Sequence, residues 1–370
     1  MITNIQVLRG LAALAVVLLH SEYKLFGVVS TQFQGVSIFF VISGFIVAYI
    51  TKPGMDDFMA RRVIRIVPIY WVVTVFGFFW LSLAEFDWVW WILHNPIQAV
   101  RQALNALRNG RAIHDVLYSM FFVPYRDSVS GDYGSFIYSG WTLNIELFFY
   151  VLFAAFGIAG RRIAMIGVAA VFLVLAWLHG STSMDGALVR FYGQSVALYI
   201  ASGFVVYEVW EKLGKAASFV PKALLAGVGS LVAVLLVALN CAQVWYPSMG
   251  ASTAMVALYY SLPPLVVLSA LMLHSAGMRC TWRPFMILGD ISYVLYLSHV
   301  LVLTTMGRYE KTYPILDYSS SFTGMLTALT LCCVIAWFLH VRVEVPLLRL
   351  GKEFLDRRRR PVGIAASGRH

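Results

Sequence analysis

The sequence has little charge. Only 12 % of its 370 residues are Asp, Glu, Lys or Arg, whereas 60 % are hydrophobic, and a typical soluble protein has about 25 % charged residues. This is too little polar surface to cover a water-soluble protein of this size, so the composition predicts an integral membrane protein. The net charge of +10 then indicates basic loops or anionic ligands rather than nucleic acid.

Cysteines and the common cofactor motifs are also scarce. The four cysteines give no disulfide framework, and we expect them to pack against their neighbours. The sequence has no metal-ligand spacing, no Walker loop and no dinucleotide fingerprint, so we expect neither a metal nor a permanently bound cofactor. No small-x-small cleavage site follows the first apolar run, which is therefore expected to remain as the first membrane helix.

Long apolar runs fill most of the chain. A helix needs about 20 mostly apolar residues to cross the hydrocarbon, and this criterion predicts an all-α protein with about ten membrane-spanning helices in one bundle. The segment 85–140 has only short apolar stretches and is expected to lie at the interface, to re-enter the membrane or to form a short hairpin. The expected spans are 7–26, 33–51, 66–84, 141–159, 163–179, 190–207, 223–240, 252–274, 286–306 and 321–341.

Basic residues are distributed unevenly around these spans. If the N-terminus is inside, 20 of the 28 Lys and Arg residues fall in inner segments. An excess of basic residues marks the cytoplasmic side, so both termini are expected in the cytoplasm. We expect one membrane domain over residues 1–345, and a basic cytoplasmic tail over 346–370 that is disordered and touches anionic lipid through Arg357–Arg360.

The first apolar run has a polar, ionisable side chain near each end, Arg9 and His20, and such side chains are energetically unfavourable in the hydrocarbon region. Eleven residues correspond to about three helical turns, so the two side chains project from nearly the same face, roughly 16 Å apart. Taken singly, Arg9 is explained about as well by a positive-inside anchor, and His20 by a polar helix end. Their shared face favours a functional pair.

Three arginines, Arg61, Arg62 and Arg65, follow the second expected span. They lie within about one turn of each other on a helix. Guanidinium groups bind phosphate through paired hydrogen bonds, so the cluster suits a phosphate-bearing ligand. The positive-inside rule taken alone explains the cluster better, so its role depends on the rest of the chain.

Polar residues also interrupt other apolar segments. Glu146 is a carboxylate inside a predicted span, where it is expected to face the protein interior with a partner. Tyr296 and His299 lie on one face of an expected helix. There His299 either joins neighbouring helices through hydrogen bonds or takes a direct catalytic role. Ser43 lies among small residues that favour close helix packing, and it would need a neighbouring base to act as a nucleophile.

Together these motifs resemble the acyltransferase family 3 membrane proteins, most nearly the ExoZ-type branch that modifies exopolysaccharides. The resemblance covers nearly the whole chain. It rests on an arginine and a histidine separated by ten residues (Arg9 and His20) and on Arg-x-x-Arg (Arg62 and Arg65). The segments GVSIFFVISGF, GWTLNIE and ISYVLYLSH complete the pattern.

The sequence departs from this family pattern at two places. It has Ser37 where other members often have an acidic residue, and Thr142-Leu143 where they often have Ser-Leu. These departures weaken any functional role carried over to Ser37 or Thr142. They do not affect the arginine and histidine motifs.

The resemblance implies transfer of an acyl group, acetyl by default or succinyl as the alternative, from cytoplasmic acyl-CoA to a carbohydrate hydroxyl outside the bacterial cytoplasmic (inner) membrane. His20 would act as general base or carry an acyl-histidine intermediate. Glu146 would orient its ring, and Arg9 would anchor the donor or stabilise developing negative charge. The remaining expected site residues are Arg61, Arg62 and Arg65 for acyl-CoA, with His299, Tyr296 and Ser43 in support.

Two other functions stay open from the residues alone. Buried Arg, His and Glu side chains would also suit a proton-coupled secondary transporter of a small solute or polysaccharide precursor. Against it, no pair of Gly/Pro-broken spans recurs at matching positions in the two halves. A passive scaffold for polysaccharide assembly is the third possibility. The acceptor sugar and the oligomeric state do not follow from the sequence.

Overall fold

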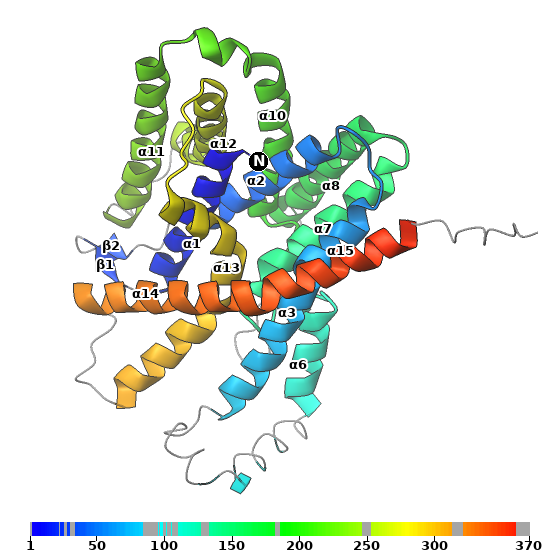
Figure 1. The fold of residues 1–370 in the computed structure, drawn as a ribbon, viewed down its shortest axis with the longest axis vertical. Coiled ribbons are helices and arrows are strands. Elements are labelled where there is room, and N and C mark those ends of the chain that lie inside the picture. Colours follow the sequence, from blue (N-terminus) through cyan, green and yellow to red (C-terminus); the bar gives the residue numbers. More distant parts are fainter. Residues whose placement is uncertain are drawn as a thin grey trace, which may run out of the picture.

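The computed structural model describes residues 2–21, 23–25, 28–29, 34–83, 95, 97–98, 101, 105, 110–126, 133–181, 186–245, 253–312 and 321–359. Its described residues are mostly helical (Figure 1), in agreement with the all-α prediction. The helices are α1 (Thr3–His20), α2 (Gly35–Ile50), α3 (Phe58–Leu83), α6 (Gly110–Met120), α7 (Gly140–Gly157), α8 (Arg161–Ser181), α9 (Ala187–Tyr192), α10 (Leu198–Leu213), α11 (Lys222–Trp245), α12 (Thr253–Ser275), α13 (Arg283–Thr312), α14 (Phe322–Leu339) and α15 (Val345–Arg359).

Short elements complete the described chain. Single turns of 3₁₀-helix lie at Ser195–Ala197 and Ala216–Phe219, and a π-helical turn at His340–Glu344 joins α14 to α15. The strands occur as two antiparallel pairs of two residues each. They are β1 (Lys24–Leu25) with β2 (Val28–Val29), and β3 (Tyr125–Arg126) with β4 (Tyr133–Gly134).

The described part of the chain contains seven helical segments that are long and apolar enough to cross a membrane. These segments agree with the membrane protein that the composition predicts. Two shorter apolar helices coincide with the expected spans 33–51 and 223–240. The seven segments are Thr3–His20, Phe58–Leu81, Gly140–Gly157, Arg161–Ser181, Val256–Ser275, Arg283–Glu310 and Phe322–Arg358, and the shorter ones are Gly35–Ile50 and Lys222–Ala238.

The expected span 190–207 is wrong as a single helix. It is divided between α9, which ends at Tyr192, and α10, which begins at Leu198. Between them Gln194 has an extended backbone, and Gly193 lies so close to other backbone that an added Cβ would be 2.5 Å from the Leu175 carbonyl oxygen. Hydropathy alone does not detect this break, because the residues on both sides are apolar.

Helix ends differ from the prediction at three functionally important places. His20 is the last residue of α1 rather than an interior residue of a span 7–26. α3 begins at Phe58, so the arginine cluster belongs to its first turns. The tail expected to be disordered continues as α15 to Arg359. Within the segment 85–140, α6 is helical and the β3–β4 pair is extended. Residues 85–94 of this segment lie outside the described residues.

Two close helix contacts fix the centre of the bundle. At Gly10 of α1, an added Cβ would lie 2.9 Å from the backbone nitrogen of Gly289 on α13, and at Gly44 of α2 it would lie 2.1 Å from the Ile200 carbonyl oxygen on α10. Small residues let membrane helices approach this closely. The contact at Gly44 confirms the packing role expected for the small residues near Ser43. The contact at Gly10 brings α13 against α1.

Candidate active site

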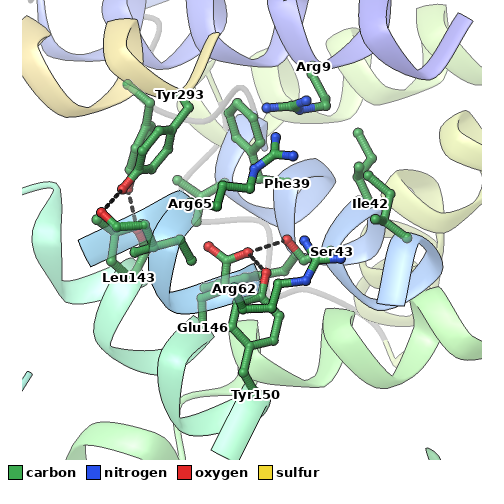
Figure 2. Close-up of a pocket in the computed structure, with 16 residues that line it drawn as sticks. Arg9, Phe39, Ile42, Ser43, Arg62, Arg65, Leu143, Glu146, Tyr150 and Tyr293 are labelled. Carbon is green, nitrogen blue, oxygen red and sulfur yellow. Dashed lines mark hydrogen bonds between the residues drawn. The ribbon is translucent and has the colours of Figure 1, made fainter. Parts of the chain in front are cut away.

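A cavity of about 80 Å³ inside the bundle gathers polar side chains from five helices. We call it the arginine cavity (Figure 2). Three guanidinium groups face it against one carboxylate, so the wall has an excess of positive charge. This arrangement suits an anionic ligand. Its polar lining residues are Arg9 of α1, Ser43 of α2, Arg62 and Arg65 of α3, Thr142, Glu146 and Tyr150 of α7, and Tyr293 and Tyr296 of α13.

Glu146 is held by two hydroxyl groups. Ser43 Oγ donates to Glu146 Oε1 at 2.8 Å, and the Tyr150 hydroxyl, one turn along α7, donates to the same oxygen. Figure 2 shows both bonds converging on the carboxylate below Arg65. Among the described residues no hydrogen bond joins Glu146 to His20. The carboxylate that the family resemblance assigns to orienting the His20 ring is bound by Ser43 and Tyr150 instead.

Arg62 is buried between two aromatic rings. Its guanidinium carbon lies 5.3 Å from the centroid of Tyr150 and 5.8 Å from that of Phe58, and only 7 % of the residue is exposed. Stacking on aromatic faces favours the flat guanidinium group over an ammonium group. The head group therefore stays fixed at the cavity wall without a carboxylate partner of its own in the described hydrogen bonds.

Arg9 is positioned by a chain of two hydrogen bonds. Its Nη1 donates to Gln6 Oε1 at 3.4 Å, and Gln6 Nε2 donates to Asp290 Oδ1 at 2.6 Å. Sequence reasoning missed this chain, because Asp290 lies on another helix and only the tertiary contact reveals its partner. Gln6 could have been noticed, since it lies one turn before Arg9 on the same face of α1.

A larger hollow of about 510 Å³ lies next to the arginine cavity, and the two share Ile46, Arg62 and Arg65 in their walls. We call it the outer hollow. Arg61 faces it, so the structure brings the three predicted arginines together at the junction of the two spaces. The helix α15 forms part of its wall through Lys352 and Asp356, two residues that the sequence assigned to a disordered tail.

His20 lies outside the arginine cavity and beside another histidine. Its ring centroid is 5.0 Å from that of His299 and 5.6 Å from that of Tyr138. Tyr296, which lines the cavity, has its ring 5.8 Å from His299. Tyr296 and His299 thus connect the arginine cavity to His20, and we call His20 and His299 the histidine pair.

The predicted site residues therefore fall into three groups. Arg9, Ser43, Arg65, Glu146 and Tyr296 line the arginine cavity, together with Arg62. Arg61 faces the outer hollow, whereas His20 and His299 form the histidine pair. Among the described residues there is no cluster of three His, Cys, Asp or Glu side chains that could hold a metal ion.

Comparisons with known proteins identify the family of this chain. A family model described as an acyltransferase domain matches residues 2–341. The chain is 30 % identical over 328 residues to the exopolysaccharide production protein ExoZ of Rhizobium meliloti (strain 1021), which covers 86 % of this chain and 90 % of that protein. No solved structure matches.

Two further relatives are more distant. The chain is 25 % identical over 380 residues to the "Putative peptidoglycan O-acetyltransferase YrhL" of Bacillus subtilis (strain 168), covering 95 % of this chain and 56 % of that protein. It is 27 % identical over 288 residues to Nodulation protein 10 of Rhizobium leguminosarum bv. viciae, covering 74 % of this chain and 72 % of that protein.

Proposed function

The chain belongs to the acyltransferase family, and from this premise we propose that it moves an acyl group, acetyl in the simplest case, from cytoplasmic acyl-CoA to a carbohydrate hydroxyl outside the bacterial cytoplasmic membrane. The names of ExoZ and YrhL refer to exopolysaccharide production and to peptidoglycan O-acetylation. Both are carbohydrate polymers of the bacterial surface, which supports an acceptor of this class. Membership of an enzyme family disfavours the transporter and the scaffold.

The observation that carries the proposal is the shared wall of the two spaces. Arg62 and Arg65 face both the outer hollow and the arginine cavity. Coenzyme A has its phosphates at one end and its thioester at the end of a long thin arm. We assign the phosphates to the outer hollow, where Arg61 and Lys352 join Arg62 and Arg65 and outnumber three aspartates, and the arm to the arginine cavity. The aspartates are Asp56, Asp57 and Asp356. The excess of basic residues supports a cytoplasmic position for this end of the bundle.

Arg9 is assigned to the donor. Since Arg9 and His20 are separated by about 16 Å along α1, Arg9 does not reach an oxyanion that forms beside His20. It does line the arginine cavity with Arg65, where it meets the anionic donor. Glu146 supplies a negative charge that offsets part of the repulsion among the three guanidinium groups in a low-dielectric space.

His20 is assigned as the general base. Its Nδ1 is 2.9 Å from the Val16 carbonyl oxygen, which only accepts, so Nδ1 bears the hydrogen and Nε2 has the free electron pair. The acceptor oxygen attacks the thioester carbon, its proton moves to Nε2, and the C–S bond breaks. The departing sulfur then takes the proton and leaves as the free thiol. Attack by Nε2 itself, giving an acyl-histidine, is the main variant.

The test is acyl transfer by the purified protein in lipid vesicles. The donor is acetyl-CoA labelled in its acetyl group, with succinyl-CoA in a parallel series, and the acceptor is base-deacylated exopolysaccharide from the producing cell. We expect the label in ester linkage on the glycan, and mass analysis identifies both the acyl group and the sugar. Solute movement across the vesicle without acyl-CoA, and no label on any glycan, would contradict the proposal.

A further inference from the structure

Both rings of the histidine pair are fixed in the same tautomer. His299 Nδ1 lies 2.6 Å from the Tyr296 carbonyl oxygen, as His20 Nδ1 lies 2.9 Å from that of Val16. A carbonyl oxygen only accepts, so each Nδ1 donates and each Nε2 has a free electron pair. The pair therefore offers two hydrogen-bond acceptors and no donor on the nitrogens that remain.

His299 Nε2 is buried without a hydrogen-bond partner in the described part of the chain. The residue is 0 % exposed, and a buried polar atom without a partner costs about 1–3 kcal/mol. The ring next to it is that of His20, at a centroid distance of 5.0 Å and an interplanar angle of 56°. Two neutral rings of this tautomer cannot satisfy each other through Nε2, because neither supplies a hydrogen there.

The two rings lie on helices that are in close contact with each other. α1 and α13 lie in backbone contact at Gly10 and Gly289, where an added Cβ would collide with the opposite helix. The other ring against His20 is Tyr138, and α2 has no charged side chain over Gly35–Ile50. No carboxylate is hydrogen-bonded to either ring in the described residues, so a positive charge on His20 lacks the usual anionic partner.

We propose that His299 Nε2 is the group that accepts a hydrogen bond from the His20 imidazolium during transfer. This inference rests on the proposed function. When His20 Nε2 takes the proton of the acceptor hydroxyl, it becomes a donor, and the unpartnered Nε2 of His299 becomes its acceptor. The pair then satisfies both nitrogens only in the state that follows proton removal. When the proton passes to the departing sulfur, the pair returns to its resting form. His299 acts through His20 and is a positioning residue.

The test compares two replacements of His299 that separate hydrogen bonding from shape. His299→Gln keeps an acceptor oxygen on a flexible chain, whereas His299→Phe keeps the ring and loses the acceptor. We expect His299→Phe to lower kcat for acetyl transfer by about 10- to 100-fold, the value of a hydrogen bond to a charged group, with the KM for acetyl-CoA unchanged. His299→Gln should recover part of that loss.

A packing role predicts the opposite order, because the phenyl ring fills the site better than an amide. Equal or higher kcat for His299→Phe than for His299→Gln, in variants of wild-type melting temperature, would overturn the inference. In a His20→Ala background, His299→Phe should have no further effect. Ser298→Ala changes the buried residue directly before His299 on α13, and it serves as a control that should have wild-type kcat. A wild-type protein without acyl transfer refutes the proposed function and this role with it, whereas failure of the inference alone leaves wild-type transfer intact.

Discussion

The arginine cavity and the histidine pair are neighbouring regions of the proposed active site, but their side chains differ in chemistry. The cavity brings three guanidinium groups against one carboxylate, and its charges are held by hydroxyl groups, aromatic rings and an amide. The histidine pair contacts a neutral tyrosine ring and backbone carbonyl oxygens. Positive charge is concentrated where an anionic donor would enter, and it is absent where a proton would move.

This difference assigns separate tasks to the two regions. Fixed charge favours binding of an anion in both the ground state and the transition state, and such uniform binding lowers KM. A base with a free nitrogen contributes to the chemical step, which appears in kcat. Substitutions in the cavity should therefore change mainly the KM for the donor, and substitutions in the pair should change mainly kcat.

The largest effect is expected at His20. His20→Ala removes the only base assigned to the reaction, and general-base catalysis is worth about 10²–10⁴-fold, so kcat should fall by that factor. Binding of CoA, measured by calorimetry on the purified protein, should stay unchanged because the arginines are intact. Ser21→Ala, at the next position, is the control. Wild-type kcat in His20→Ala would remove the histidine pair from the mechanism.

Arg65 should show the converse behaviour. Arg65→Ala removes a guanidinium group from both spaces, and the KM for acetyl-CoA should rise about 10- to 100-fold, as for loss of a charge-assisted hydrogen bond, with a smaller change in kcat. The rise should shrink in high salt, which screens the exposed part of the interaction. Arg162→Ala, on an exposed residue outside both spaces, should leave KM unaltered. A loss confined to kcat would place Arg65 with the chemical step instead.

Substitution of Glu146 tests whether the arginine cavity and the histidine pair act separately. Glu146→Ala leaves the Ser43 and Tyr150 hydroxyl groups without their acceptor and the arginines without an opposing charge, and we expect the unfolding free energy to fall by about 1–3 kcal/mol. Glu146→Gln retains an acceptor oxygen and should lose less. Thermal unfolding in detergent measures both. If instead Glu146→Gln keeps its stability and loses kcat to the level of His20→Ala, then Glu146 serves His20, as the family resemblance implies.

The smallest effect is expected at the rim of the outer hollow. Lys352 of α15 lies in its wall, and an exposed charge pair contributes about 0.2–1 kcal/mol. Lys352→Ala should therefore raise the KM for acetyl-CoA by about two- to fivefold. Arg349→Ala is the matched control, because it removes the same charge from the same helix outside the hollow. Equal effects of the two variants would indicate general surface charge rather than a donor contact.

Features that depend on local sequence were largely predictable. The helices follow from apolar runs, and the common face of Arg9 and His20 follows from helical geometry, because both residues lie on one helix. The helix α15 was missed for a physical reason. Its own sequence is charged, and it is held by packing on α3, where Gly351 lies so close that an added Cβ would be 2.3 Å from Ile64.

The amino-acid sequence alone predicts that this chain lies in a membrane, that its helices have polar residues at particular positions, and which family it resembles. The partners of those polar residues emerge only from the packing of the helices. Glu146 pairs with Ser43 and Tyr150, and His20 lies against His299. Periodicity fixes the direction of a side chain on its own helix, whereas its partner depends on the close contacts between helices, such as that between Gly10 and Gly289.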